Sequence, residues 1–184
     1  MTPRLDPLPA EGNPPEIQLL LDGAAGSTGG AANIFRTLAH HPGVLRRFLP
    51  FGGKLLFGGR LPARDRELLI LRTAWNCGSD YEWGQHARIG RLAGLTDEEI
   101  IRVAAGPGEP AWDEADAELL RAADELLADH RLGEPSWTAL AARFGPEELI
   151  EIILLVGNYA MLAGFLNTAG VEREPGVEGF PELG

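Results

Sequence analysis

The sequence contains almost no cysteine. Cys77 is the only one among 184 residues. A single cysteine cannot form a disulfide within the chain, and a metal site built from cysteines alone is equally excluded. Nothing in the cysteine content requires an oxidising compartment, so we expect a cytoplasmic location.

Positive charge is also scarce. Sixteen Lys and Arg stand against 27 Asp and Glu, which gives a formal net charge of −11. This balance repels phosphate backbones and anionic lipid headgroups, so we expect neither nucleic acid nor a membrane as a partner. Hydrophobic residues make up 45% of the chain and charged residues 23%, which is typical of one globular domain.

The N-terminal residues lack the unbroken apolar run of a signal peptide. Residues 152–171 form one uncharged segment, which approaches the roughly 20 residues that cross a bilayer. This segment contains Gly157, Asn158 and Asn167, and no cluster of Lys or Arg flanks it. We therefore predict a helix buried in an obligate oligomer.

Strand patterns are missing as well, because no segment alternates between apolar and polar residues over any length. The sequence predicts an all-α fold, a bundle of helical hairpins. Apolar spacing and capping signals predict helices over residues 34–40, two short ones within 44–57, then 62–76, 79–93, 97–104, 113–130, 135–144 and 147–168. We expect a loose N-terminal arm (1–30) able to carry one short helix, a helical domain (31–171) and a C-terminal tail (172–184).

Glu82 and His86 are the first candidates for chemistry. They are four residues apart on one predicted helix, so they share a face where a carboxylate can orient an imidazole and the pair can move a proton. A structural alternative stays open. Glu82 stands three residues after Ser79, the spacing of a capping box, and His86 is then an ordinary half-buried helix residue.

Glu67 is the second candidate carboxylate. Gly78 is expected to turn the chain between two antiparallel helices, and at about 1.5 Å per residue this arrangement places His86 opposite Ile70. Glu67 lies one helical turn from Ile70, so its carboxylate can approach His86. The alternative is a surface ion pair with a neighbouring Arg64 or Arg66.

The remaining candidates are weaker. Arg72 can bind a substrate carboxylate or pair with a helix neighbour. Four aromatic residues can either line a pocket or pack in the core or at a subunit contact: Trp75, Tyr81, Trp83 and Tyr159. Adjacent His40 and His41 cannot point the same way, so no metal site is predicted. Phosphate-binding and dinucleotide-binding glycine motifs are absent, and we expect no cofactor.

Three motifs carry a resemblance to a known family. They are Arg64-Asp65-Arg66-Glu67-Leu68, Tyr81-Glu82-Trp83-Gly84-Gln85-His86, and residues 93–100. The sequence resembles the carboxymuconolactone decarboxylase family, which includes alkylhydroperoxidase D, and less sharply its single-domain decarboxylase-like subgroup over residues 33–170. The resemblance implies a helical-hairpin fold and a homo-oligomer, either a trimer or a hexamer.

The peroxidase branch of this family has the motif Glu-x11-Cys-x2-Cys-x3-His. Aligned with this sequence, the motif places the Glu at Glu67 and the His at His86, but the two cysteine positions hold Ser79 and Glu82. The resemblance therefore excludes dithiol peroxide reduction, because nucleophile and resolving thiol are both absent and Cys77 lies two positions away.

What the resemblance leaves is a decarboxylase-like enzyme with Glu67, Glu82 and His86 as catalytic residues. Such an enzyme would act as a cofactor-free carbon–carbon lyase on a small organic acid or lactone. The substrate-binding residues would be Arg72, Tyr81, Trp83 and Tyr159. Alternatives remain: a non-catalytic oligomeric or binding protein of the same fold, or an enzyme that isomerises, dehydrates or reduces peroxide without a dithiol.

Overall fold

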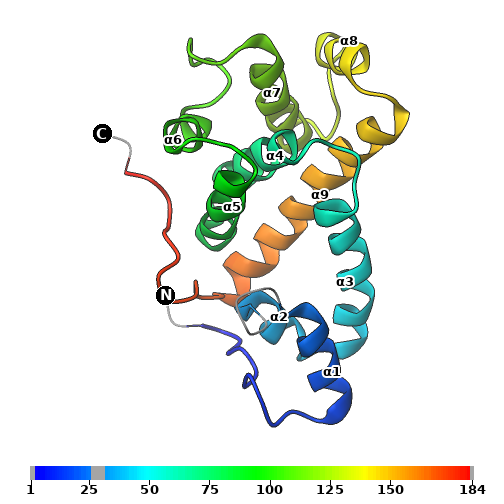
Figure 1. The fold of residues 1–184 in the computed structure, drawn as a ribbon, viewed down its shortest axis with the longest axis vertical. Coiled ribbons are helices and arrows are strands. Elements are labelled where there is room, and N and C mark those ends of the chain that lie inside the picture. Colours follow the sequence, from blue (N-terminus) through cyan, green and yellow to red (C-terminus); the bar gives the residue numbers. More distant parts are fainter. Residues whose placement is uncertain (1–2, 26–31, 183–184) are drawn as a thin grey trace. The chain divides into compact units, whose positions relative to one another are not determined.

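The computed structural model describes residues 3–25 and 32–182, and in this part of the chain every regular element is an α-helix (Figure 1). The all-α prediction is confirmed. The chain divides into two compact units: Met1–Gly58 with Phe165–Val177, and Gly59–Gly164 with Glu178–Gly184. The boundaries predicted at residues 30 and 171 stay predictions.

The first unit contains α1 (Pro15–Ala24), α2 (Asn33–Leu38) and α3 (Pro42–Phe57). Its core consists of Leu21, Ala39 and Leu45. The expectation of two short helices in residues 44–57 is wrong, because α3 continues through Pro50. A proline removes one helical hydrogen bond and glycines cost only about 1 kcal/mol each. Burial of Leu45 and Leu55 on either side of Pro50 offsets this penalty.

Asn33 precedes the helix predicted over residues 34–40 and is of a type that favours the N-cap, but it does not cap α2. The N-cap is Ala32, and the Asn33 side-chain amide donates to the Glu172 carbonyl while its oxygen accepts from Arg36. The side chain is therefore used for a long-range contact within this unit, which single-sequence capping rules do not reveal.

The second unit is organised around α4 (Ala63–Asn76). This helix contacts α5 (Asp80–Leu92), α6 (Asp97–Ala105) and α7 (Glu114–Ala128). Four consecutive α4 residues have no exposed surface, as expected of a central helix: Leu68, Leu69, Ile70 and Leu71. Gly78 has φ +62°, a left-handed conformation that glycine adopts without strain, and it turns the chain from α4 into α5.

Capping signals fix the later helix starts well. Thr96 and Glu99 form the predicted capping box at α6: the Thr96 Oγ1 accepts from the Glu99 amide at 3.2 Å, and the Glu99 carboxylate accepts from the Thr96 amide at 2.8 Å. Asp113 caps α7. The chain continues with α8 (Glu134–Arg143) and α9 (Pro146–Ala169), both close to the predicted ranges.

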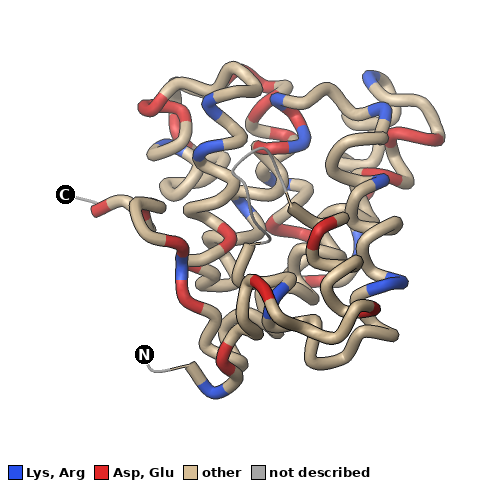
Figure 2. The backbone as a smooth tube through the Cα atoms, turned by 60° about the horizontal axis from the view of Figure 1, so that its bottom comes forward, with Lys and Arg blue, Asp and Glu red and all other residues tan. Residues whose placement is uncertain are grey.

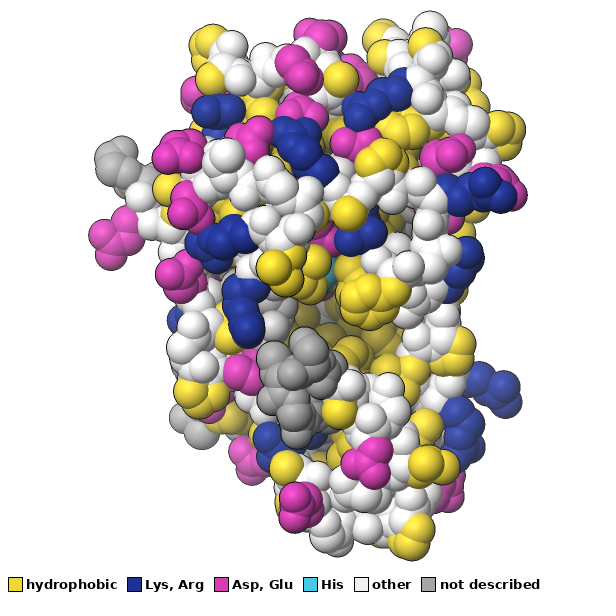
Figure 3. Space-filling view, in the orientation of Figure 1, with side chains coloured by type: hydrophobic (Ala, Val, Ile, Leu, Met, Phe, Trp, Pro, Cys, Tyr) yellow, Lys and Arg dark blue, Asp and Glu magenta, His cyan; other side chains and the backbone are white. Residues whose placement is uncertain are grey.

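The last helix, α9, is long and apolar enough to cross a membrane, with a mean hydropathy of 2.0 in its most apolar window. Half of that window is buried inside the structure. Several of its large apolar side chains are nevertheless exposed: Ile150, Ile153, Leu154 and Met161. Figure 2 shows acidic and basic positions interspersed along the backbone, and Figure 3 shows apolar side chains between charged ones on one face.

The described end of the C-terminal tail packs on the α4–α5 hairpin. The Phe180 ring lies 5.0 Å from the Trp75 ring and 5.6 Å from the Trp83 ring. The Phe180 amide donates to Asp80 Oδ1 at 2.7 Å. These contacts fasten the tail to the hairpin and bury the indole of Trp83.

Candidate active site

Glu67 and His86 form a direct hydrogen bond between α4 and α5. The His86 Nδ1–H donates to Glu67 Oε2 at 2.7 Å. Glu67 has no exposed surface, and 7% of the His86 side chain is exposed. Within residues 3–25 and 32–182 this is the ring's single hydrogen bond, so Nε2 has no partner there. The carboxylate thereby fixes the tautomer and the direction of the imidazole.

The second oxygen of Glu67 is paired with the neighbouring arginine. Arg66 Nε donates to Glu67 Oε1 at 3.0 Å, and 13% of the Arg66 side chain is exposed. Arg64 does not take part, because its guanidinium binds Glu99 and Asp116. The ion pair and the histidine contact, which the sequence presents as alternatives, therefore exist together.

Glu82 is buried, and only 3% of the residue is exposed. Neither of its carboxyl oxygens has a hydrogen-bond partner among residues 3–25 and 32–182. The capping-box alternative is wrong, because no side chain caps α5 and the Ser79 hydroxyl is also unpaired. Burial raises the pKa of Glu82 well above its usual range. Burial therefore favours the protonated carboxylic acid, which has one O–H donor.

Tyr159 of α9 packs against the imidazole. The rings of Tyr159 and His86 lie 4.8 Å apart at 88°, an edge-to-face contact. Burial, with the charges of Glu67 and Glu82, raises the pKa of Tyr159 well above 10.0, and the cation of Arg66 opposes this rise. The hydroxyl therefore stays a phenol.

Arg72 lies in a different set of contacts. Its guanidinium donates to both oxygens of Asp124, at 2.6 and 3.0 Å, and to the carbonyls of Val103 and Ala104. These bonds tie α4 to α6 and α7. The structure therefore assigns Arg72 to packing, and it does not bring this residue to the Glu67–His86 pair.

The two other aromatic candidates are buried. Trp83 packs with Trp75 at 5.6 Å and with Phe180, and Tyr81 is 5% exposed on the first turn of α5. For Trp83, the packing alternative describes what the structure shows. Burial and the nearby charge of Glu82 raise the pKa of the Cys77 thiol, the opposite of the shift that activates a cysteine.

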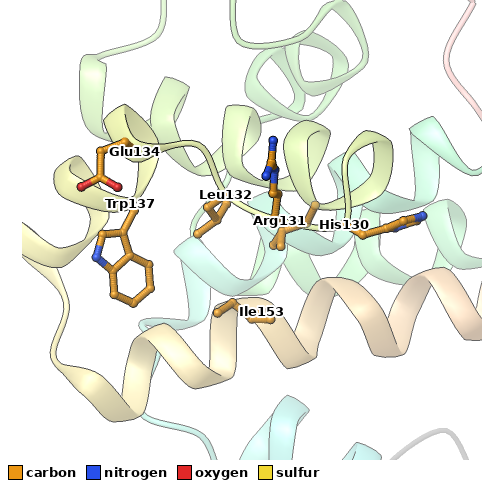
Figure 4. Close-up of a pocket in the computed structure, with 7 residues that line it drawn as sticks. His130, Arg131, Leu132, Glu134, Trp137 and Ile153 are labelled. Atoms are coloured by element: carbon orange, nitrogen blue, oxygen red, sulfur yellow. The ribbon is translucent and has the colours of Figure 1, made fainter.

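A surface hollow of about 420 Å³ lies away from these residues. It is lined by His130 and Arg131 after α7, Trp137 of α8 and Ile153 of α9 (Figure 4). None of the predicted site residues lines it. Across the described part of the chain, no group of three or more His, Cys, Asp and Glu is placed to hold a metal ion.

Three further polar groups lie in this unit with roles that the sequence does not define. The sequence indicates Arg66 only as a competing ion-pair partner for Glu67, and Ser79 only as a capping residue, whereas the Ser79 hydroxyl is unpaired among the described residues. Asn158, which the sequence places in the apolar last helix, has a buried Oδ1 without a partner in the same part of the chain. The position of Arg66 directly before Glu67 was the one available signal for its involvement.

Comparison with known proteins supports the sequence resemblance. The model of the carboxymuconolactone decarboxylase family matches residues 42–125, from α3 into α7. This range contains Glu67, Glu82 and His86. A comparison with curated proteins gives no match.

Solved structures show the same fold. An uncharacterized peroxidase-related protein from Ralstonia eutropha JMP134, with an alkylhydroperoxidase AhpD core, is 21% identical with a TM-score of 0.79, covering 93% of each chain. A peroxidase-related protein from Silicibacter sp. TM1040 is 16% identical with a TM-score of 0.82, covering 96% of this chain and 95% of that one. The debrominase Bmp8, bound to 2,3,4-tribromopyrrole, is 15% identical with a TM-score of 0.74, covering 93% and 91%.

Proposed function

Because residues 42–125 match the model of the carboxymuconolactone decarboxylase family, we propose that the chain is a cofactor-free carbon–carbon lyase acting on a small organic acid or lactone. One observation carries this proposal: the buried hydrogen bond between Glu67 and His86, with the buried carboxyl group of Glu82 one helical turn away on α5. An oriented imidazole beside a second acidic group is what proton transfer at a carbon atom needs.

In the decarboxylation of a substrate whose carboxylate is β to a carbonyl group, each residue has one role. The carbon–carbon bond to the carboxylate breaks, carbon dioxide leaves, and the electron pair moves to the carbonyl oxygen. The O–H of Glu82 donates to that oxygen and stabilises its developing negative charge. The His86 imidazolium then delivers a proton from Nε2 to the carbon, and solvent restores the proton.

Glu67 and Tyr159 position the imidazole. Glu67 stabilises the protonated ring through Nδ1, and Tyr159 holds the ring plane by its edge-to-face contact. Glu82 therefore has a different role from the one its spacing suggests, since its carboxyl group makes no hydrogen bond to His86.

An isomerase is the second candidate function. The same acid and base can move a proton between two carbon atoms without breaking a carbon–carbon bond. A non-dithiol peroxidase has less support, because the burial that raises the pKa of Cys77 disfavours its thiolate. In a non-catalytic binding protein, the unpaired carboxyl group of Glu82 would have no role to offset the cost of its burial.

The proposal is tested with a panel of lactones and of unsaturated and 3-oxo dicarboxylic acids. Carbon dioxide release and ultraviolet absorbance are followed separately, so that decarboxylation is distinguished from isomerisation. Glu82→Gln and His86→Gln should each lower turnover by roughly 10² to 10⁴, the usual contribution of a positioned acid or base. The double variant should be hardly worse than either single one.

Two surface substitutions serve as matched controls. Glu98 and His130 are exposed, and Glu98→Gln and His130→Asn make the same kinds of change away from the site. Both should keep wild-type turnover. If turnover survives Glu82→Gln and His86→Gln, these residues are structural and the proposed function is wrong.

A further inference from the structure

We propose that Arg66 binds a carboxylate group of the substrate through its two terminal nitrogens, Nη1 and Nη2. This inference rests on the proposed function and identifies the group that recognises the acid. The sequence suggests Arg72 for this task, but Asp124 occupies that guanidinium in the structure.

The two terminal nitrogens of Arg66 make no hydrogen bond to the residues that the structure describes. The only hydrogen bond from this side chain to them is the one from Nε to Glu67 Oε1. The other shielded arginines of α4 are engaged: Arg64 with Glu99 and Asp116, and Arg72 with Asp124. A guanidinium that is 13% exposed and keeps two free terminal groups is suited to receive an anion.

The position of Arg66 connects it to the reacting groups. Its Nε holds one oxygen of Glu67, whose other oxygen holds His86. The positive charge of Arg66 also favours a lower pKa for Tyr159, whose ring packs on the His86 ring. An anion bound to Nη1 and Nη2 therefore lies beside the cluster that performs proton transfer.

The chemistry of the site defines the ligand class. A planar guanidinium matches the two oxygens of a carboxylate, so the ligand is a small organic mono- or dicarboxylate. The chain carries a net charge of −11, which repels anions over most of its surface. A local cation beside Glu67 and Glu82 is therefore needed to hold an acidic substrate there.

The test measures binding directly, by isothermal titration calorimetry with straight-chain dicarboxylates from succinate to pimelate and with their dimethyl esters. The wild-type protein should bind one of the diacids more tightly than its ester. Arg66→Gln should weaken the binding of that diacid by about 10- to 100-fold, the usual range for a hydrogen-bonded charge, and leave ester binding unchanged.

Arg88→Gln is the matched control. Arg88 is an exposed arginine of α5, so this variant removes one surface charge and should bind the diacid as the wild type does. Arg66→Lys keeps the positive charge but cannot form two parallel hydrogen bonds to one carboxylate. It should therefore lose less affinity for the diacid than Arg66→Gln does. It also serves as the test variant if thermal unfolding shows that Arg66→Gln does not fold.

The outcomes separate this inference from the lyase proposal. Diacid binding that depends on Arg66 without turnover of any panel member supports the anion site and contradicts the lyase. Equal affinity of wild type and Arg66→Gln for the diacid, or no preference of the wild type for any diacid over its ester, contradicts the anion site. If Arg66→Gln weakens the binding of diacid and ester equally, Arg66 does not bind the carboxylate and acts only through Glu67, which also contradicts the anion site.

Discussion

The Oε2 of Glu67 lies 2.7 Å from the Nδ1 of His86, although the two residues are 19 positions apart in the sequence. Gly78 makes this contact possible, because its left-handed conformation turns α4 into α5. The bond occupies the Nδ1 of the imidazole, and Nε2 has no hydrogen bond to the residues that the structure describes. The structure thus pairs His86 with Glu67 and leaves Glu82, four residues away on α5, as a separate acid.

Glu82→Gln should change the pH dependence of stability. The folded protein raises the pKa of this carboxyl group, so above a pH of about 4.3 the unfolded chain loses the proton while the folded chain keeps it. Wild-type stability should therefore fall as pH rises, by up to about 1.4 kcal/mol per pH unit from this group.

The variant lacks this titration. Its free energy of unfolding relative to wild type should increase as the pH rises above about 4.3, measured by urea denaturation at a series of pH values. Glu98→Gln, at an exposed position, should show no such trend. A flat difference between Glu82→Gln and wild type would mean that Glu82 is ionised in the folded state.

Arg72→Gln should destabilise the protein without affecting diacid binding. The substitution breaks a two-point ion pair with Asp124 and leaves the carbonyls of Val103 and Ala104 without this donor. We expect a loss of about 1 to 3 kcal/mol in the free energy of unfolding. If calorimetry on the folded variant instead shows weakened diacid binding with unchanged stability, Arg72 belongs to the substrate site.

Cys77→Ser should leave activity largely intact. The chain has no second cysteine, and burial raises the pKa of this thiol, so it is not poised to act as a nucleophile. Turnover should change by less than about tenfold, well below the effect of a lost acid or base. A folded Cys77→Ser protein without activity would support a thiol mechanism.

We also propose that a second copy of the chain covers part of α9. Ile150, Ile153, Leu154 and Met161 expose large apolar surfaces on this helix, which carries no charge after Glu151. Multi-angle light scattering should give the mass of a closed oligomer, and the family resemblance implies a trimer or hexamer. A monodisperse monomer at micromolar concentration would contradict this.

The sequence predicts the helices well where local signals decide them. Gly78 marks a turn and Thr96 with Glu99 marks a cap, each of which depends on a few neighbouring residues, and the structure has both of them. The prediction fails at Pro50, where a local breaker is overridden by burial of apolar residues on both sides.

In the candidate site, too, the sequence predicts what depends on local helix geometry and fails where distant residues decide. The turn at Gly78 places His86 opposite Ile70, one helical turn from Glu67, so helix geometry alone predicts the contact between Glu67 and His86. Neither the unpaired state of Glu82 nor the capture of Arg72 by Asp124 could be predicted, because both depend on which residues of other helices surround them. Spacing along the sequence identifies residues that share one face of a helix, but it does not show which residues of other helices contact that face.

The central claim is that Glu67 and His86 act as one proton-transferring unit, and a double-variant cycle tests it most directly. With the substrate identified from the panel, kcat/KM is measured for wild type, Glu67→Gln, His86→Gln and the double variant, after unfolding curves show that all four are folded. We predict that each single substitution lowers kcat/KM by roughly 10² to 10⁴ and that the double variant is no worse than the His86 variant. Independent effects that multiply in the double variant, or a Glu67→Gln protein with wild-type kcat/KM, would contradict the claim.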